Sequence, residues 1–433
     1  MSDTVLMILV TGGFLVLLMG GMWVPFAVGL TALGYLLAIM GPAGLKAVGL
    51  VSWSSANSFL LTAIPLFVFM SAILSNAGLS HRVYAALSQL VRRLPGGLLQ
   101  TNIAGCTMFA AISGSSVATA AAIGSIALPQ LKARGYDARM ASGSLAAGGT
   151  LGILLPPSIA MIIYGTFTDT SIAKLFMAGI IPGLLVAGAF MVYIAIRCLI
   201  NPRLAPKETA DSDHSRIGAL LELTPFVLLI GLVLGSLYAG LATPTEVAAI
   251  GCVASFAIAA AYRSLTWQVL VASLVETIRI SGSILFIVLS AYLLSYAMTM
   301  GGIAQQLASW IADLGLSRLQ IIIAIAILYI VLGWFVESMA MIVITVPMLF
   351  PVLVMAGIDP LWFGIILVLF VEIGQISPPF GINLFVIQNL MGGRYSDMVM
   401  GAVPYMLILL GMVAVFTIWP EIITWLPSIT ATR

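Results

Sequence analysis

The chain of 433 residues is 61% hydrophobic, only 7% of its residues carry a charge, and its formal net charge is +2. An ordinary soluble domain has about 25% charged residues, so this composition excludes a water-soluble fold. Apolar segments of roughly 17 to 25 residues, the length that crosses a bilayer as a helix, recur along almost the whole chain. Runs such as 178–196 do not alternate between apolar and polar residues, which predicts helical spans rather than a membrane β-barrel.

The first apolar span is expected at about 4–20. No Lys or Arg precedes it, so the charged leader of a cleavable signal peptide is missing and we expect a retained first helix. The elements that follow in the first half are expected as spans at 25–42 and 58–76, an amphipathic stretch at 79–97, a hairpin at about 100–130, a long interrupted helix at 138–165 and a span at 177–196.

A charged segment at 201–218 follows and is predicted to be a cytoplasmic linker. The same order of elements then returns in the second half. Its elements are expected at 221–239, 244–262, 280–299, 302–316, 319–352 (the second hairpin), 360–390 (the second interrupted helix) and 402–420.

Gly, Pro and Asp residues recur at one constant spacing, which indicates an internal repeat. Eight of them have an identical residue 222 positions later, and a shorter set of matches keeps a spacing of 219. We therefore predict two repeats, 1–200 and 219–433. The eight residues are Pro129, Gly135, Asp137, Gly152, Pro156, Pro157, Gly179 and Pro182, with copies at Pro351, Gly357, Asp359, Gly374, Pro378, Pro379, Gly401 and Pro404.

The positive charges are consistent with repeats of opposite orientation. If each hairpin enters and leaves the bilayer on one side, each half crosses it five times, and an odd number inverts the second copy. Cytoplasmic loops are rich in Lys and Arg, and a periplasmic N-terminus places twelve of these residues in the cytoplasm. Only Lys46, Lys174, Arg318 and Arg433 fall outside, with Arg279 left uncounted near a helix start. We expect both termini to be periplasmic.

The centre of the first hairpin interrupts an apolar sequence with Ser113, Gly114, Ser115, Ser116 and Thr119. A helix that breaks at membrane depth must have its backbone groups satisfied by protein, water or a bound solute, which suggests a binding site. Small hydroxylated residues also let helices pack closely and bond each other's carbonyl groups, and this structural role stays open.

The second hairpin carries Glu337 at the position of Ser115, and Glu372 aligns with Thr150. Acids at membrane depth are costly and suggest function by default. Three roles stay open for Glu337 and Glu372, namely binding an ion, relaying a proton or pairing with another group. Among the other acids of the second half, Glu276 lies three residues before Arg279, which predicts a local ion pair.

The two interrupted helices carry AAGGTLGILLPPSIA at 146–160 and VEIGQISPPFGIN at 371–383. Paired Gly and Pro in both halves are typical of the discontinuous helices of secondary transporters, where freed carbonyl groups and helix ends bind ions and substrate. Each proline removes a backbone donor, so the breaks are set by the covalent chain, although a simple kink is the alternative. The prolines are Pro156, Pro157, Pro378 and Pro379.

Several enzymatic motifs are absent from the sequence, including GxxxxGK[ST] and GxSxG. The two histidines, His81 and His214, form no catalytic or metal-binding pattern. We therefore expect no enzyme.

Four segments, SGSSVATAAAIG, LPQLKARGYD, AAGGTLGILLPPS and ISPPFGIN, occur in this order and resemble the large membrane subunit of tripartite ATP-independent periplasmic (TRAP) transporters, the DctM-like family. The resemblance covers essentially the whole chain. It implies an all-α polytopic membrane protein with two inverted repeats that works by an elevator mechanism in the bacterial inner membrane. It also implies Na⁺ symport of a small organic anion, such as a dicarboxylate or a sialic acid.

Carried over to this sequence, the resemblance places Na⁺ near Ser113, Ser115, Gly152, Glu337 and Gly374. No Arg lies at a predicted hairpin tip, so substrate carboxylates would bind helix N-termini and hydroxyl groups. The full set of candidate residues for substrate and ions is Ser113, Gly114, Ser115, Ser116, Thr119, Gly149, Thr150, Gly152, Pro156, Pro157, Glu337, Ser338, Glu372, Gly374, Gln375, Ser377, Pro378 and Pro379.

The resemblance further implies two protein partners, a small four-helix membrane subunit that is DctQ-like and a soluble periplasmic substrate-binding protein. No cofactor is expected apart from Na⁺ as the coupling ion. The alternative function is a stand-alone ion-coupled carrier or antiporter for organic anions, which would need neither partner.

Overall fold

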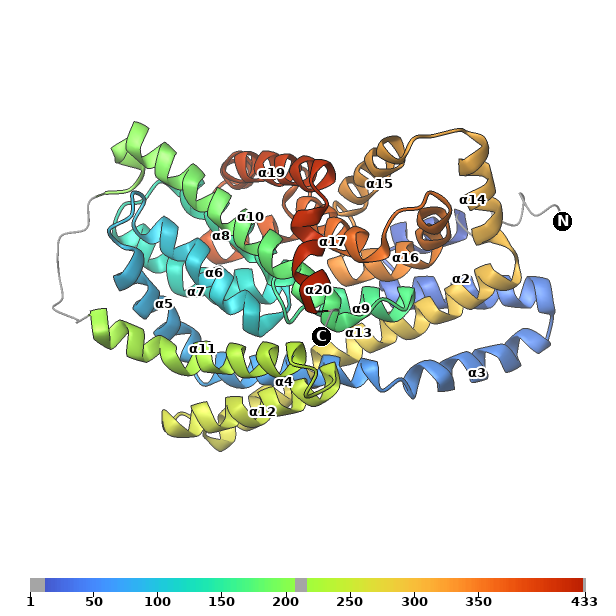
Figure 1. The fold of residues 1–433 in the computed structure, drawn as a ribbon, viewed down its shortest axis with the longest axis horizontal. Helices are drawn as coiled ribbons and strands as arrows, with labels where there is room; N and C mark the ends of the chain where they lie inside the picture. Colours follow the sequence, from blue (N-terminus) through green and yellow to red (C-terminus); the bar gives the residue numbers. More distant parts are fainter. Residues whose placement is uncertain (1–11, 207–215, 431–433) are drawn as a thin grey trace.

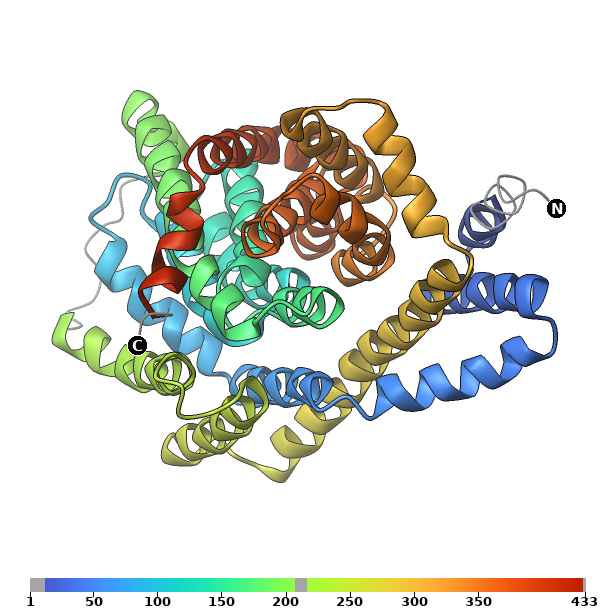
Figure 2. The same ribbon diagram turned by 45° about the vertical axis from the view of Figure 1, so that its right-hand side comes forward.

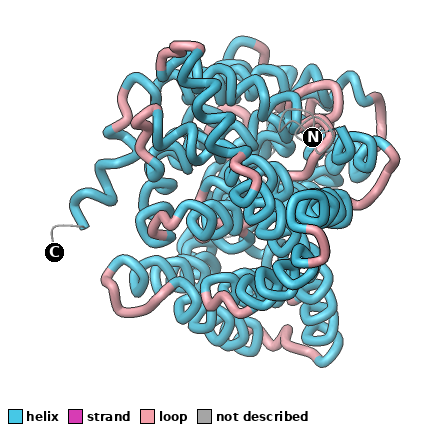
Figure 3. The backbone as a smooth tube through the Cα atoms, turned by 90° about the vertical axis from the view of Figure 1, so that its right-hand side faces the viewer, coloured by secondary structure: helices cyan, strands magenta, loops and turns pink. Residues whose placement is uncertain are grey.

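A computed structural model describes residues 12–206 and 216–430 of the chain. These two parts consist of helices and connecting loops and contain no strand, as Figure 3 shows. Residues 12–19 are helical, so the later part of the first expected span is described, whereas its beginning lies outside the described residues. The centre of the charged linker, 207–215, also lies outside them.

The first half has a helix for every element that the sequence predicts there. The expected first hairpin consists of α6 and α7, and the interrupted helix consists of α8 and α9. The helices of this half are α2 (Val24–Met40), α3 (Ala43–Ala56), η1 (Leu60–Thr62), α4 (Ala63–Asn76), α5 (Leu79–Val91), α6 (Leu98–Ser113), α7 (Ser116–Ala133), α8 (Ala138–Leu154), α9 (Ile159–Thr168) and α10 (Ile172–Ile200).

The second half repeats this order after a short η2 (Pro202–Leu204). Its hairpin consists of α15 and α16, and its interrupted helix consists of α17 and α18. The helices are α11 (Arg216–Tyr238), α12 (Pro244–Ala261), α13 (Trp267–Met300), α14 (Ile303–Asp313), α15 (Arg318–Leu332), α16 (Ser338–Met355), α17 (Pro360–Ile376), α18 (Ile382–Met391), α19 (Tyr395–Ile418) and α20 (Glu421–Thr430).

The structure has two helices that the sequence does not predict, and several other helices begin earlier than predicted. Helix α3 occupies a stretch where no element was expected, and α20 follows the last expected span. Helix α13 begins at Trp267 rather than near 280 and reaches 34 residues. Helix α11 begins at Arg216, inside the segment that we assigned to the linker.

The helices form two groups, which Figures 1 and 2 show from two directions. Helices α2, α3, α4, α11, α12 and α13, which we call the outer layer, lie along the lower side of Figure 1. Within this layer α13 packs against α2, α3 and α4, and α4 also packs against α12. The hairpins and interrupted helices lie together above the outer layer.

The two hairpins exchange partners between the repeats. In the first hairpin, α7 packs against α8 of its own repeat and against α18 of the other repeat. In the second hairpin, α16 packs against α17 of its own repeat and against α9 of the other. Each interrupted helix therefore bridges both hairpins, and neither repeat completes this core alone.

Each interrupted helix begins with the same local structure. Asp137 caps α8 by accepting a hydrogen bond from the Met140 amide at 2.9 Å, and Asp359 caps α17 by accepting from the Leu361 amide at 2.8 Å. The glycine two residues before each cap has a positive φ, 71° at Gly135 and 63° at Gly357. Both glycines and both aspartates belong to the residues that recur at the spacing of 222. The two interrupted helices therefore start at equivalent positions of the two repeats.

Six helices are long and apolar enough to cross a membrane within the described residues, or up to eight if two bent helix pairs each count as one span. The bent pairs are α3 with η1 and α4, bent by 58°, and α8 with α9, bent by 40°. Shorter apolar helices, among them α2, α6, α15 and α17, accompany them. The protein is therefore a multi-pass integral membrane protein.

Helices α8 and α19 cross so closely that no side chain lies between their backbones at Gly143 and Gly401. A Cβ added at Gly143 would overlap the backbone of Gly401, and a Cβ added at Gly401 would overlap the Arg139 carbonyl oxygen. Close backbone approach at small residues is a common basis of helix association in membranes. An ion pair, with 2.9 Å between Arg139 Nε and Asp397 Oδ1, lies beside this crossing.

Replacing Gly401 by Ala should destabilise the folded protein by roughly 1–3 kcal/mol, the usual cost of overpacking a filled contact. The matched control is Gly411→Ala on the same helix, because a Cβ added at Gly411 meets nothing within 4 Å. We expect the control to leave the melting temperature unchanged or slightly higher, since Ala is the better helix former. Thermal unfolding of the purified proteins in detergent measures both, and equal melting temperatures would contradict the close crossing.

Candidate functional site

The tip of the first hairpin gathers hydroxyl groups around one carbonyl group. Helix α6 ends at Ser113, its C-cap Gly114 has a φ of 64° and turns the chain, and Ser115 caps α7. The carbonyl oxygen of Ser115 accepts hydrogen bonds from Thr119 Oγ1 at 2.8 Å and from Ser113 Oγ at 3.4 Å. The sequence-predicted residues Ser113, Gly114, Ser115 and Thr119 therefore form one compact unit.

This first tip lies directly against the first helix break. The Ile159 amide donates to the Gly114 carbonyl oxygen at 3.4 Å. A Cβ added at Gly114 would lie 2.8 Å from the Pro157 carbonyl oxygen. On α8, a Cβ added at Gly152 would overlap the Ser115 carbonyl oxygen, so glycine is required for this approach.

Two further candidate residues on α8, Gly149 and Thr150, make contacts of a different kind. A Cβ added at Gly149 would strike Ala120 of α7, so Gly149 also permits the close packing of these two helices. Thr150 is fully buried and donates to the Ala147 carbonyl oxygen of its own helix at 2.7 Å. Thr150 thus has the partner of an ordinary helix-bonded threonine.

Asn383 of α18 joins the first tip to the second repeat. Its Nδ2 donates to Ser116 Oγ at 2.6 Å and approaches the Ala146 carbonyl oxygen at 3.4 Å, while its Oδ1 is buried without a partner. Sequence reasoning missed Asn383 as a site residue. The available signal was a polar residue directly after the second proline pair, in ISPPFGIN.

The tip of the second hairpin uses a carboxylate where the first uses a hydroxyl group. Glu337 caps α16, accepting from the Met339 amide at 3.0 Å and from Ser338 Oγ at 2.5 Å. Glu337 and Ser115 therefore cap equivalent helices, as their alignment at the repeat spacing requires.

The second tip also lies against a helix break. A Cβ added at Gly333 would overlap the backbone of Gly374. Trp334 Nε1 donates to Ser377 Oγ at 3.0 Å, and Ser377 Oγ donates to the Gly374 carbonyl oxygen at 3.1 Å. The candidates Gly374 and Ser377 thus contact the hairpin rather than solvent.

Both helix breaks fall at the prolines. Helix α8 ends at Leu154 and α9 begins at Ile159, while α17 ends at Ile376 and α18 begins at Ile382. The peptide bonds Pro156–Pro157 and Pro378–Pro379 are both cis. The Ser158 hydroxyl caps the new helix and donates to the Ile153 carbonyl oxygen at 2.5 Å.

Glu372 and Gln375 on α17 have no hydrogen-bond partner. Both side chains are fully buried, and all four of their polar atoms lack a partner. They are three residues apart on the helix, so they lie on the same side of it. A buried carboxyl group without a partner is costly and makes this face of α17 a candidate for an ion or a proton.

A cavity of about 650 Å³ lies where the two hairpin tips meet the outer layer. Ser113, Ser115 and Glu337 line it from the tips, and Ser71 of α4 and Ser283 of α13 line it from the opposite side. Thr150, Glu372, Gly374, Gln375 and Ser377 do not line it. The predicted residues therefore divide into a cavity group and a group packed around the helix breaks.

Two charged residues of α13, Glu276 and Arg279, also line the cavity. We expected them to form a local ion pair, and this prediction was wrong, because the ion pairs of the described residues do not include them. Glu276 Oε2 instead accepts a hydrogen bond from Asn76 Nδ2 at 2.8 Å. Spacing on one helix permits an ion pair but does not decide between it and a partner on another helix.

The fold and the site define a polytopic transport protein with two inverted repeats, each with a hairpin and a broken helix. The family model described as the tripartite ATP-independent periplasmic transporter, DctM component, matches residues 11–422. The chain belongs to this family and is a large permease subunit of a TRAP transporter.

Curated relatives support this assignment, and a solved structure shares the fold. The C4-dicarboxylate TRAP transporter large permease protein DctM of Pseudomonas aeruginosa is 35% identical over 90% of this chain and 91% of its own length. The isethionate TRAP transporter permease protein DctMQ of Oleidesulfovibrio alaskensis is 32% identical over 95% of this chain and 65% of its own length. The crystal structure of the YdaH transporter of Alcanivorax borkumensis shares the fold, with a TM-score of 0.63, 17% identity and coverage of 88% of this chain and 90% of that one.

Asn383 and Ser116 should stabilise the protein as a pair, because their side chains are fully buried and bonded to each other across the two repeats. A double-mutant cycle with Asn383→Leu and Ser116→Ala, measured by thermal unfolding, should give a coupling energy of about 0.5–3 kcal/mol. Strictly additive effects of the two substitutions would show that the contact does not exist.

Proposed function

We propose that this permease imports a small organic anion, such as a C4-dicarboxylate, a sialic acid or another carboxylate, by symport with Na⁺. The observation that supports it most is the cavity of about 650 Å³ between the two hairpin tips and the outer layer. A relative is named for C4-dicarboxylates, which makes this substrate class the first to test. The homologous proteins are permeases, which agrees with a transport role rather than an enzymatic one.

Sodium would bind at the two tips. At the first tip the Ser115 carbonyl oxygen, already approached by Thr119 and Ser113, offers oxygen ligands close to Gly152. At the second tip the Glu337 carboxylate and the Gly374 carbonyl oxygen offer the same kind of ligand. Helix ends and carbonyl groups freed at a break are the usual Na⁺ ligands in secondary transporters with broken helices.

An elevator movement would carry the hairpins and interrupted helices as one body past the outer layer. Three features support this proposal. The two hairpins are joined by exchanged contacts with α9 and α18, the site residues lie on this body, and the cavity is lined on one side by this body and on the other by α4 and α13.

The permease would act with a small four-helix membrane subunit and a periplasmic substrate-binding protein. The DctMQ relative, of which about a third lies outside the match to this chain, supports a second membrane component. Several large apolar side chains of the outer layer are exposed, including Trp53, Leu50 and Val253, and such a surface suits lipid or a membrane partner. We place the protein in the inner membrane with periplasmic termini, as the Lys and Arg distribution suggests.

Uptake by reconstituted vesicles tests the proposed function. Vesicles that contain this chain and its small subunit should take up succinate only when an inward Na⁺ gradient and the loaded binding protein are both present. A thermal-shift screen of the binding protein against organic acids identifies the preferred acid. Full-rate uptake by this chain without either partner would instead establish a stand-alone carrier.

Ser115→Ala and Gly152→Leu should each abolish Na⁺-dependent uptake, because the first removes a hydroxyl group from the cavity and the second fills the contact with the first tip. Matched controls are Ser125→Ala, an exposed serine on the same helix, and Gly188→Leu, where an added Cβ meets nothing within 4 Å. All four variants should insert and bind the small subunit. Unchanged uptake in both site variants would place the ion site elsewhere.

A further inference from the structure

We propose that Arg279 of α13 binds the carboxylate of the transported anion from the outer-layer side of the cavity. This inference rests on the proposed function for the nature of the cargo. It assigns a fixed positive charge to the wall that faces the hairpin tips, where the sequence-based expectation relied on hydroxyl groups and helix ends alone.

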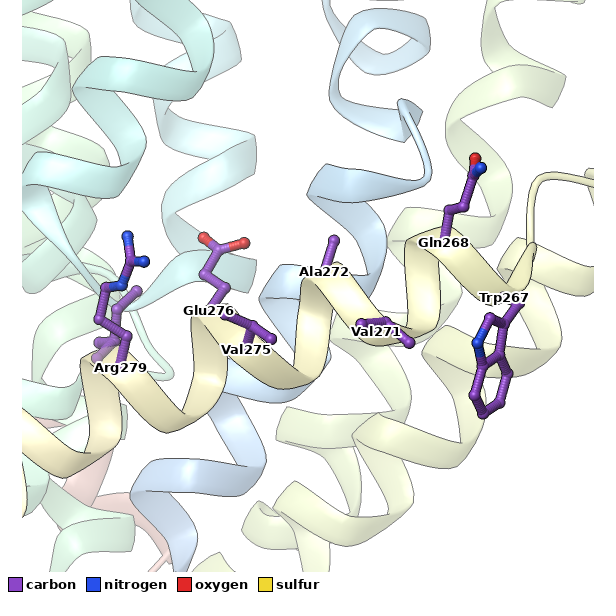
Figure 4. Close-up of a pocket in the computed structure, with 8 residues that line it drawn as sticks. Trp267, Gln268, Val271, Ala272, Val275, Glu276 and Arg279 are labelled. Carbon is purple, nitrogen blue, oxygen red and sulfur yellow. The ribbon is translucent and has the colours of Figure 1, made fainter.

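Arg279 lies where two hollows of the molecule meet. A groove of about 820 Å³ lies along one face of α13 from Trp267 to Ile280 and is lined by residues of that helix, and it shares lining residues with the cavity of about 650 Å³ at the hairpin tips. Glu276, Arg279 and Ile280 line both. Figure 4 shows Glu276 and Arg279 on the same side of α13, with Gln268 and Ala272 further along that side. A solute that moves between the groove and the tips passes Arg279.

Arg279 lies well inside a candidate membrane span, where a charged side chain is unusual. Helix α13 is a candidate membrane span of 34 residues, and Arg279 lies twelve residues after its start, about 18 Å along the axis. Charged residues within membrane helices commonly mark ion or substrate pathways. The rest of the lining near Arg279 is mostly apolar, for example Val275, Ile280 and Ile284.

The guanidinium group of Arg279 has no partner among the described residues. Two other arginines pair with acids, Arg82 with Glu222 and Arg139 with Asp397. Glu276, the nearest acid along the helix, accepts from Asn76. A guanidinium group presents five donors in a planar fork that fits a carboxylate through two parallel bonds. The side chain is exposed and therefore available to a solute.

The residues on the hairpin-tip side of the cavity also favour binding of the anion's carboxylate at Arg279. Glu337 lines the cavity with a carboxylate, which repels an anion unless a cation is bound beside it. Ser113 and Ser115 on that wall are neutral. A dicarboxylate placed between the walls would therefore turn one carboxylate toward Arg279 and leave the Na⁺ sites to the tips.

The test uses the permease reconstituted with its small subunit and with succinate-loaded binding protein under a Na⁺ gradient. Arg279→Gln should lower the initial rate of succinate uptake by roughly 10- to 100-fold, the range expected for loss of a charge-assisted hydrogen bond. Arg279→Lys should retain intermediate activity, because it keeps the charge and loses the fork. The control Arg93→Gln, an exposed arginine outside both hollows, should transport as the unsubstituted protein does.

A chemical-rescue experiment distinguishes a need for positive charge at position 279 from a purely structural role of the side chain. The native cysteines are buried, so the Arg279→Cys variant offers the accessible thiol. A cationic methanethiosulfonate reagent should restore part of the uptake, and the anionic sulfonatoethyl reagent should not. Rescue by both reagents, a thiol that neither reagent labels, or full uptake by Arg279→Gln would each overturn the assignment. Failure of the unsubstituted complex to take up succinate would instead contradict the proposed function for this acid, while labelling of the thiol would still report on the junction.

Discussion

The requirement that every backbone group inside a membrane be satisfied governs this structure. Two helices break at proline pairs in the interior, and each break exposes amide and carbonyl groups that lipid cannot satisfy. At the first break the hairpin tip supplies a partner, because the Ile159 amide donates to the Gly114 carbonyl oxygen. At the second break the Ser377 hydroxyl donates to the Gly374 carbonyl oxygen and accepts from Trp334 of the second tip. Hairpin and broken helix thus depend on each other, which explains why glycines at Gly152 and Gly374 are needed where the two backbones meet.

The repeat keeps this backbone arrangement and varies the side chains. Ser115 and Glu337 cap equivalent helices, and Thr150 and Glu372 occupy equivalent positions. Thr150 bonds to its own helix, whereas Glu372 is buried without a partner beside Gln375. The first half-site is therefore neutral and locally satisfied, whereas the second carries two acids, of which Glu337 is hydrogen-bonded as a cap and Glu372 has no partner. Any cation bound by this protein meets two chemically different sites in one symmetric frame.

Features that a residue's own covalent structure imposes on the backbone, such as a helix break at a proline pair, could be predicted from the sequence. Contacts between side chains on different helices could not. The helix breaks at the proline pairs and the bounds of both hairpins follow from local chemistry, and each of these features occurs in both repeats. Helix α3 escaped prediction because its sequence contains Lys46, three serines and two glycines, and its helix is supported by packing against α2 and α13. Asn383 and Arg279 escaped for a related reason, since their importance comes from what faces them on other helices.

The extra length of α13 and the separate helix α3 are one difference between the repeats. At the spacing of 219, α3, η1 and α4 of the first half correspond to the single helix α13 of the second. The first copy bends by 58°, whereas the second is one continuous helix, and Arg279 takes the position that corresponds to Leu60 at the start of η1. Both copies line the cavity, and α13 brings Arg279 and Glu276 to it where α4 brings Ser71. This break in symmetry places Arg279 and Glu276 of the outer layer in the wall of a cavity that Glu337 of the second tip also lines.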